Sequence, residues 1–130
     1  MAIGGCAANA AIDLRRLSPR DACVGCVRDH PFSHFVIDTL HDSHLQTTAI
    51  RVAGDVPTSG TLIVNVRGED RRFIHNMGAN AVLSVDDVPD EALEAARVLS
   101  VGGYLLMPAL RADGLAALFP RARAGGGRTR

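Results

Sequence analysis

The feature that most constrains this chain is a run of β-branched residues enclosed by turn-forming ones. Residues 61–66 read TLIVNV, with Gly60 before them and Gly68 soon after. β-Branched side chains favour extended backbone, and glycine marks where a strand ends. A return segment, RFIHN, follows at residues 72–76 after a connection of hairpin length. The sequence therefore predicts a β-hairpin.

The predicted hairpin runs into a small-residue turn, GAN, at residues 78–80. Glycine permits a tight backbone here, and the side chain of Asn80 offers both a hydrogen-bond donor and an acceptor. A polar hairpin that ends in such a turn can cover a ligand as a flap, and it can equally be an ordinary sheet edge. The hairpin residues by themselves leave both interpretations open.

The composition is that of one globular domain without a strong electrostatic preference. The chain has 130 residues, of which 47% are hydrophobic and 22% charged, and its formal net charge is zero. A chain of this length can bury roughly two-thirds of its unfolded surface. Zero net charge gives no general attraction to nucleic acid or to an anionic membrane, so we expect neither as a partner.

Nothing at the start of the sequence resembles a targeting signal. The first residues have neither a basic lead nor a long apolar core, so no signal peptide is predicted. The longest apolar run, residues 98–110, is too short to span a bilayer. We therefore expect a cytoplasmic protein.

A glycine pair precedes an alanine-rich helical pattern near the start of the chain. Residues 4–11 read GGCAANAA, and the apolar residues from there on recur at helical spacing: Ala7, Ala10, Ala11, Leu14 and Leu17. Ser18 and Pro19 are expected to stop this helix. Glycines before a helix let another group approach the free N–H groups of its first turn. Asn9 can alternatively form a local hydrogen bond within that turn.

A Cys-x-x-Cys pattern follows, formed by Cys23 and Cys26, with His30 and His34 close behind. In an extended strand, residues three apart point to opposite faces, so the two thiols are not expected to converge. The loop from cysteine to histidine is also shorter than zinc fingers use. We interpret the cysteines as buried small residues, with a zinc or redox site as the weaker alternative.

Beyond these cysteines the chain alternates between strand and helix patterns. The predicted strands cover residues 22–27, 46–52 and 98–101, and the predicted helices begin at Pro31 and Asp90. This alternation indicates an α/β fold with a largely parallel sheet. Ligands of such sheets gather at the carboxyl ends of strands, and residues 102–104, GGY, lie at one of these ends.

The last part of the chain is expected to form a helix and then a tail. Residues 113–118 have a helical pattern, which Pro120 is expected to break. Residues 121–130 read RARAGGGRTR and have no apolar periodicity. We therefore predict a folded domain over residues 1–120 and a disordered Gly/Arg tail over 121–130. The tail lacks the interleaved aromatic residues that nucleic-acid binding favours.

Three segments resemble the ribokinase-like (PfkB) family of carbohydrate kinases. Residues 59–80, SGTLIVNVRGEDRRFIHNMGAN, are similar to a family strand pair that ends in a Gly-Ala-Asn-like turn beside the sugar. Residues 4–11 resemble the first family signature, a Gly-Gly pair followed by a small-residue spacer and Asn. Residues 24–40 resemble a third family segment, from which they depart at Arg28, His30 and Ser33, the last standing where the family has Gly.

This resemblance implies a set of sugar-binding residues. Carried over position by position, the substrate-binding candidates are Gly4, Gly5, Asn9, Asn80 and Gly103. The Gly-Gly backbone and the Asn side chain bind sugar hydroxyls in the family. No residue of this chain is assigned a catalytic role or a metal.

The resemblance covers about residues 4–123 but only the first part of the family's length. It implies an incomplete ribokinase-like, Rossmann-like sheet with flanking helices and a β-hairpin flap. The complete family phosphorylates a sugar or nucleoside hydroxyl with ATP and Mg²⁺, using an Asp in a Gly-Ala-Gly-Asp-type loop as general base. That loop, the first family strand and the nucleotide-binding half are absent from this sequence, so we expect no cofactor and no activity from this chain alone.

Two kinds of function remain open at this point. The first is the sugar-binding part of a carbohydrate kinase, with a sugar or related small molecule as ligand and a complementary kinase half as a further partner. The alternative is a non-enzymatic interaction protein that associates with itself or another chain through an exposed sheet edge.

Overall fold

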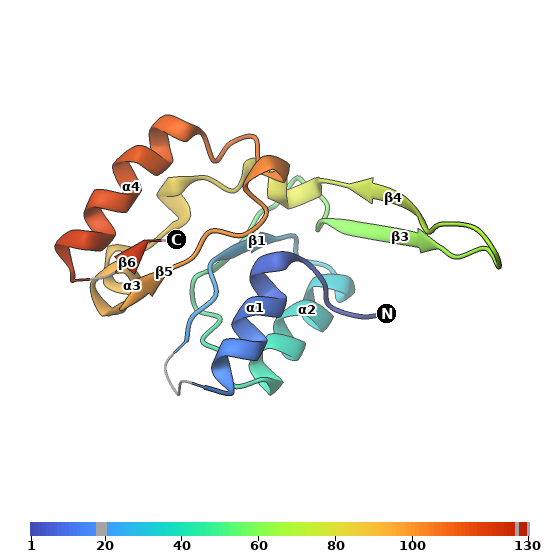
Figure 1. The fold of residues 1–130 in the computed structure, drawn as a ribbon, viewed down its shortest axis with the longest axis horizontal. Coiled ribbons are helices and arrows are strands. Elements are labelled where there is room, and N and C mark those ends of the chain that lie inside the picture. The colour runs from blue at the N-terminus through green and yellow to red at the C-terminus, as the bar shows by residue number, and fades with distance from the viewer. Residues whose placement is uncertain (18–20, 127, 130) are drawn as a thin grey trace.

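The computed structural model describes residues 1–17, 21–126 and 128–129 (Figure 1). Its α-helices are α1 (Cys6–Arg15), α2 (Pro31–Asp42), α3 (Asp90–Ala95) and α4 (Ala112–Ala124). Its strands are β1 (Gly25–Val27), β2 (Ile50–Val52), β3 (Gly60–Val64), β4 (Arg72–Asn76), β5 (Val98–Leu99) and β6 (Arg128–Thr129). Three short 3₁₀ helices are η1 (Gly78–Val82), η2 (Val85–Asp87) and η3 (Tyr104–Leu106).

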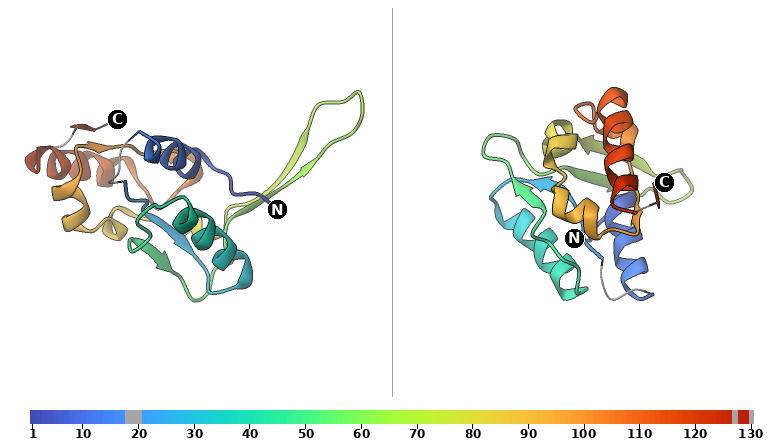
Figure 2. Two further views of the ribbon diagram at one scale, coloured as in Figure 1. Left: turned by 90° about the horizontal axis from the view of Figure 1, so that it is seen from below. Right: turned by 90° about the vertical axis from the view of Figure 1, so that its left-hand side faces the viewer.

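The predicted hairpin is confirmed. Strands β3 and β4 pair antiparallel, with Leu62 opposite Ile74 and Ile63 opposite Phe73. β3 begins at Gly60 and ends at Val64, two residues before the predicted end. Figure 2 shows the hairpin projecting from the body as a long arm. The residues of both strands beyond Gly60 are exposed, so the hairpin is held to the rest of the chain at its base.

The α/β class is confirmed, although the strands are short. Within the described residues they form three two-stranded sheets, of which β1–β2 and β5–β6 are parallel and β3–β4 is antiparallel. The predicted strand over residues 46–52 is reduced to β2, with one further bridge between Ala22 and Gln46. The strand predicted as buried over residues 98–101 is also short, and Val98 is 57% exposed, because β5 has a single neighbouring strand among the described residues.

The helix predictions hold for position but not for every end. Helix α1 ends at Arg15 rather than Leu17, and the predicted stop at Ser18 and Pro19 lies outside the described residues. The prediction that Pro120 breaks the last helix is wrong, because α4 continues through it to Ala124. Pro120 is exposed, so the carbonyl that loses its N–H partner can be hydrated.

Packing explains why α4 tolerates its proline. Leu118 and Ala122, on either side of Pro120, are each 1% exposed and pack with Leu93 of α3. Burying apolar side chains contributes on the order of 25 cal/mol per Å², which offsets the loss of one helical hydrogen bond. Figure 1 shows α4 lying over α3 and the β5–β6 pair.

A second cluster lies where β1 meets η1. Cys26 and Ala53 are nearly buried, Ala79 is fully buried, and Val56 and Leu83 pack against them. This cluster places the Gly78–Val82 turn against the end of β1. It therefore determines where the residue after Ala79, the predicted ligand Asn80, lies.

Gly78 permits two chain segments to cross closely at the base of the hairpin. Its φ is 46°, and an added Cβ would lie 2.2 Å from the carbonyl oxygen of Pro57 and 2.9 Å from the amide nitrogen of Ser59. The next amide, of Ala79, donates to the same Pro57 carbonyl at 2.7 Å. A side chain at position 78 would force these backbones apart.

We expect Gly78→Ala to lower the free energy of unfolding by about 3 kcal/mol or more, since it adds a clash with backbone to a strained φ. Gly68→Ala is the matched control, because Gly68 also has a positive φ of 80° but nothing within 4 Å of an added Cβ. The control should lose only about 1–2 kcal/mol. Chemical denaturation of the two variants checks this, and equal losses would contradict the crossing argument.

Candidate functional site

The start of α1 presents exposed backbone. Gly5 is the N-cap residue, with a φ of 95° and no side chain to cover the helix end. The amide of Asn9 donates to the carbonyl of Gly5 at 3.1 Å, which leaves the Asn9 side chain outside this local bond. Gly4, Gly5 and Asn9 are all exposed. Free N–H groups at a helix start attract electronegative oxygen atoms.

A second glycine pair lies against this helix start. An added Cβ on Gly102 would lie 2.9 Å from the Ala7 amide nitrogen and 3.3 Å from the Cys6 Cβ atom. Gly103 follows with a φ of 78° and precedes η3. The structure therefore brings the loop that contains Gly102 and Gly103, which is distant in sequence, to the helix start that follows Gly5. The sequence indicated Gly103 but not the closer approach of Gly102, whose only signal was the glycine pair.

Asn80 lies in η1 and is joined to the base of the hairpin. Its side-chain Nδ2 donates to the hydroxyl of Ser59 at 3.0 Å, and that hydroxyl donates to the carbonyl of Asn76 at 3.2 Å. Asn76 in turn accepts the Gly78 amide at 3.2 Å through its Oδ1 atom. Asn80 is half-buried, so these bonds restrict its amide. The strand pattern of the sequence gave no indication of a role for Ser59.

The predicted sugar residues thus fall into two groups. Gly4, Gly5, Asn9 and Gly103 lie around the start of α1, and Asn80 lies at the hairpin base. In the described part of the chain no hydrogen bond links Asn9 to Asn80. Two open hollows of the surface lie elsewhere, one between α3 and α4 and one between the ends of α1 and α2, and neither is lined by a predicted sugar residue. Their shared role stays a prediction.

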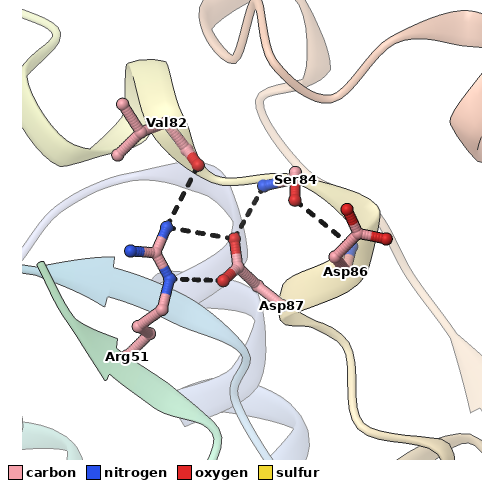
Figure 3. A network of polar contacts seen from close by, with 5 residues as sticks. All are labelled: Arg51, Val82, Ser84, Asp86 and Asp87. Carbon is pink, nitrogen blue, oxygen red and sulfur yellow. Dashed lines mark hydrogen bonds and ion pairs between the residues drawn. The ribbon is translucent and has the colours of Figure 1, made fainter.

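A polar network fastens η1 and η2 to the parallel sheet (Figure 3). Arg51 of β2 binds both carboxylate oxygens of Asp87, and its Nη2 atom also donates to the Val82 carbonyl at 3.1 Å. The amide of Ser84 donates to Asp87 at 2.8 Å and completes a capping box at the start of η2. Because Val82 ends η1, this network holds the far end of the turn that carries Asn80.

The environment of Asp87 changes its acidity. Its side chain is only 9% exposed, and burial alone would raise its pKa. The hydrogen bonds from Arg51 and Ser84 outweigh burial and lower the pKa of Asp87 below its ordinary value of 3.8. Asp87 is therefore an ionised carboxylate that accepts hydrogen bonds, and it serves as a structural anchor rather than a proton acceptor.

The pKa values of two cysteines are shifted in the opposite direction from that of Asp87. Cys23 and Cys26 are free thiols, and burial raises the pKa of each above its ordinary value. A raised thiol pKa disfavours the thiolate form that metal binding and redox chemistry require. Across residues 1–17, 21–126 and 128–129 no three His, Cys, Asp or Glu side chains are grouped to hold a metal ion.

Comparison with known proteins decides the family. A family model described as pfkB family carbohydrate kinase matches residues 1–128. The chain belongs to this family. The match includes both glycine pairs, the hairpin and Asn80, so the family segments recognised in the sequence lie within it.

Individual relatives of the pfkB family agree with this assignment. An uncharacterized sugar kinase from Pyrococcus horikoshii is 24% identical over 104 residues, which are 79% of this chain and 33% of that protein. A fructokinase from Xylella fastidiosa superimposes with a TM-score of 0.83 and 22% identity over 97% of this chain and 41% of its own. An adenosine kinase from Sinorhizobium meliloti gives a TM-score of 0.82 with 24% identity over 98% and 39%.

These structural likenesses show the ribokinase-like fold. The chain spans about a third of the curated relative and about two-fifths of the solved kinases. None of the helices within the described residues is both long and apolar enough to cross a membrane.

We expect Asp87→Asn to lower the free energy of unfolding at neutral pH by about 1–3 kcal/mol, because it weakens hydrogen bonds to a charged and buried acceptor. Asp86→Asn is the matched control, since the Asp86 side chain is exposed and only its backbone amide joins the network, through Ser84. Thermal or chemical unfolding of the two variants gives the comparison. A larger loss in the control would contradict the assigned role.

The lowered pKa of Asp87 also predicts a pH dependence. A group whose pKa is lower in the folded state adds stability above its unfolded pKa, and that stability is lost as the pH falls through the folded value. The wild-type advantage over Asp87→Asn should therefore be complete at pH 6 and shrink below about pH 4, where the unfolded carboxyl already binds protons. Unfolding measured across this range checks the sign, and an advantage that grows on acidification would contradict it.

Proposed function

We propose that this chain forms the sugar-binding part of a pfkB-family carbohydrate kinase, which as a complete enzyme transfers a phosphoryl group from ATP to a sugar or nucleoside hydroxyl. The observation that carries the proposal is the contact of Gly102 with the first turn of α1. This contact brings the loop before η3, which contains Gly103, beside the helix start that follows Gly4 and Gly5 and carries Asn9.

The chemistry of this place suits hydroxyl recognition. The start of α1 supplies free backbone N–H groups, and Asn9 adds a side-chain donor and an acceptor on the exposed surface of the same helix. Glycines at positions 5 and 103 leave the backbone accessible. A sugar hydroxyl both donates and accepts hydrogen bonds, so it can satisfy groups of both kinds.

The names of the relatives support the class of ligand. They are a sugar kinase, a fructokinase and an adenosine kinase, whose names refer to a sugar or to a nucleoside that contains one. The hairpin would act as a flap, with Asn80 at its base as the residue that reaches toward the ligand. We place the protein in the cytoplasm, where ATP and small sugars are available to such kinases.

We further propose that a polypeptide of these 130 residues does not phosphorylate a sugar by itself. It contains no Gly-Ala-Gly-Asp-type loop, and Asp29, Asp38, Asp55 and Asp70 do not lie in a glycine-rich loop that could bind phosphate. Catalysis would then require a complementary kinase half that supplies the general base and the residues for ATP and Mg²⁺.

The test combines binding with activity. D-Fructose and adenosine are titrated into the purified chain by NMR, and one of them should shift the amides of residues 4–9 with millimolar affinity. Asn9→Ala should weaken that binding about ten-fold, the loss expected for a hydrogen-bonding side chain. Gln46→Ala, which removes an exposed side-chain amide beside the parallel strands and outside the hairpin, is the matched control and should bind normally.

The same preparation is assayed for sugar phosphorylation with ATP and Mg²⁺. We expect no turnover above background. Clear turnover by the purified chain would refute its inactivity, and the absence of shifts with either ligand would refute the sugar site.

The exposed faces of the hairpin favour a second function, association with itself or with another chain. Neighbouring strand residues alternate between faces, so Leu62 and Ile74 share one face while Ile63 and Phe73 share the other. Their exposed fractions are 61%, 64%, 46% and 59% in that order. A two-stranded ribbon with exposed apolar side chains on both faces offers a surface for association with another chain.

We expect the chain to self-associate with rising concentration. Ile74→Asp should raise the apparent dissociation constant of this association about ten-fold or more, because it places a charge in the apolar contact. Leu105→Asp is the matched control, since Leu105 is 89% exposed but belongs to η3 rather than to the hairpin. Light scattering over a range of concentrations measures both. A wild-type chain that stays monomeric at high concentration would contradict this function.

A further inference from the structure

A pair of hydroxyl groups connects the base of the hairpin to the body of the protein. Ser33, in the first turn of α2, is the one polar residue of the described chain that is fully buried, with 0% exposure. Its hydroxyl forms a hydrogen bond with the hydroxyl of Thr58, which lies just before β3. A buried hydroxyl needs such a partner, so loss of this bond would lower the stability of the folded state.

The hydroxyl of Thr58 joins three parts of the chain. Besides Ser33 it binds the backbone amide of Arg28, which donates to it at 3.0 Å. Arg28 directly follows β1, Ser33 lies at the start of α2, and Thr58 leads into the hairpin. One side-chain oxygen therefore connects the end of the parallel sheet, the following helix and the first strand of the arm.

A second contact between α2 and the hairpin lies beside the Ser33–Thr58 pair. An added Cβ on Gly60 would lie 3.8 Å from the ring of Phe32, the residue before Ser33, so the first turn of α2 packs directly against the start of β3. Beyond this point the strand residues from Thr61 to Asn76 are exposed. The direction of the arm seen in Figure 2 is therefore determined at its base.

The residue after Thr58 leads to the predicted ligand. Ser59 accepts the Asn80 side-chain amide at 3.0 Å and donates to the Asn76 carbonyl at 3.2 Å. Consecutive hydroxyl residues thus serve two purposes. Thr58 binds the body of the protein, and Ser59 binds the returning strand and Asn80.

We propose that Ser33 and Thr58 are positioning residues, which hold the base of the hairpin against α2 and thereby orient Asn80 through Ser59. The part of this proposal that concerns Asn80 as a sugar ligand rests on the proposed function, whereas the part that concerns the hairpin does not.

Hydrogen exchange at the Ala79 amide, which donates to Pro57 at 2.7 Å, reports opening of the hairpin base. Ser33→Ala and Thr58→Val each remove one of the two hydroxyl groups with little change in side-chain volume. We expect the Ala79 amide to exchange about ten-fold faster in both variants. Thr58→Ser keeps the hydroxyl and should exchange as the wild type does. Ser43→Ala, which removes a comparable hydroxyl bond to the Thr39 carbonyl at the other end of α2, should also leave Ala79 unchanged.

A local effect must be distinguished from general destabilisation. The Leu45 amide, which donates to the Leu40 carbonyl at 3.1 Å after α2, is the internal reference and should exchange at the wild-type rate in the Ser33 and Thr58 variants. Unchanged protection of Ala79 in Thr58→Val would overturn the proposal. Equal acceleration at Leu45, or loss of the folded state in both hydroxyl-removing variants, would also overturn it by assigning the pair to overall stability.

The link to the ligand has its own measurement. If D-fructose or adenosine binds the wild-type chain, Thr58→Val should weaken that binding about five-fold and Thr58→Ser should restore it. Normal affinity in Thr58→Val would refute the orientation of Asn80 through Ser59. Absence of binding to the wild type would refute the proposed function, while the exchange experiment still decides how the hairpin is held.

Discussion

The close crossing of two backbone segments at the base of the hairpin is the constraint on which the arrangement of this protein depends. The Ala79 amide binds the Pro57 carbonyl, and Gly78 passes so near that oxygen that no side chain fits. Ala79 is completely buried beside Cys26 of β1. The crossing therefore anchors the exposed arm to the parallel strands and places Asn80 directly after the buried residue.

The segment that carries Asn80 is held from both sides. At the hairpin side, the hydroxyl groups of Thr58 and Ser59 connect it to α2 and to the returning strand. At the other side, Arg51 binds the carbonyl of Val82 and the carboxylate of Asp87. A short 3₁₀ turn has few hydrogen bonds of its own, so these side-chain contacts restrict the position of the segment.

Local patterns predicted the elements well where neighbouring residues alone decide them. The β-branched run and its glycines led to the hairpin, and the resulting pairs, such as Leu62 with Ile74, lie in the expected antiparallel arrangement. Predictions failed where distant contacts decide the outcome. Proline normally ends a helix, but the burial of Leu118 and Ala122 against Leu93 carries α4 past Pro120. Similarly, the apolar run at Val98 suggested a buried strand, although β5 is short and Val98 is exposed.

The sequence by itself determined the α/β class, the hairpin, the family and the choice of Gly4, Gly5, Asn9, Asn80 and Gly103 as candidate ligands, because each follows from residues that are close together in the chain. Only the tertiary structure decided which of these residues meet. It brought Gly103 to the start of α1 through Gly102, and it joined Asn80 to Ser59 instead. It also revealed the Arg51–Asp87 and Ser33–Thr58 contacts, whose partners are 36 and 25 residues apart. No local pattern encodes such pairs, because they form only after packing has brought their segments together.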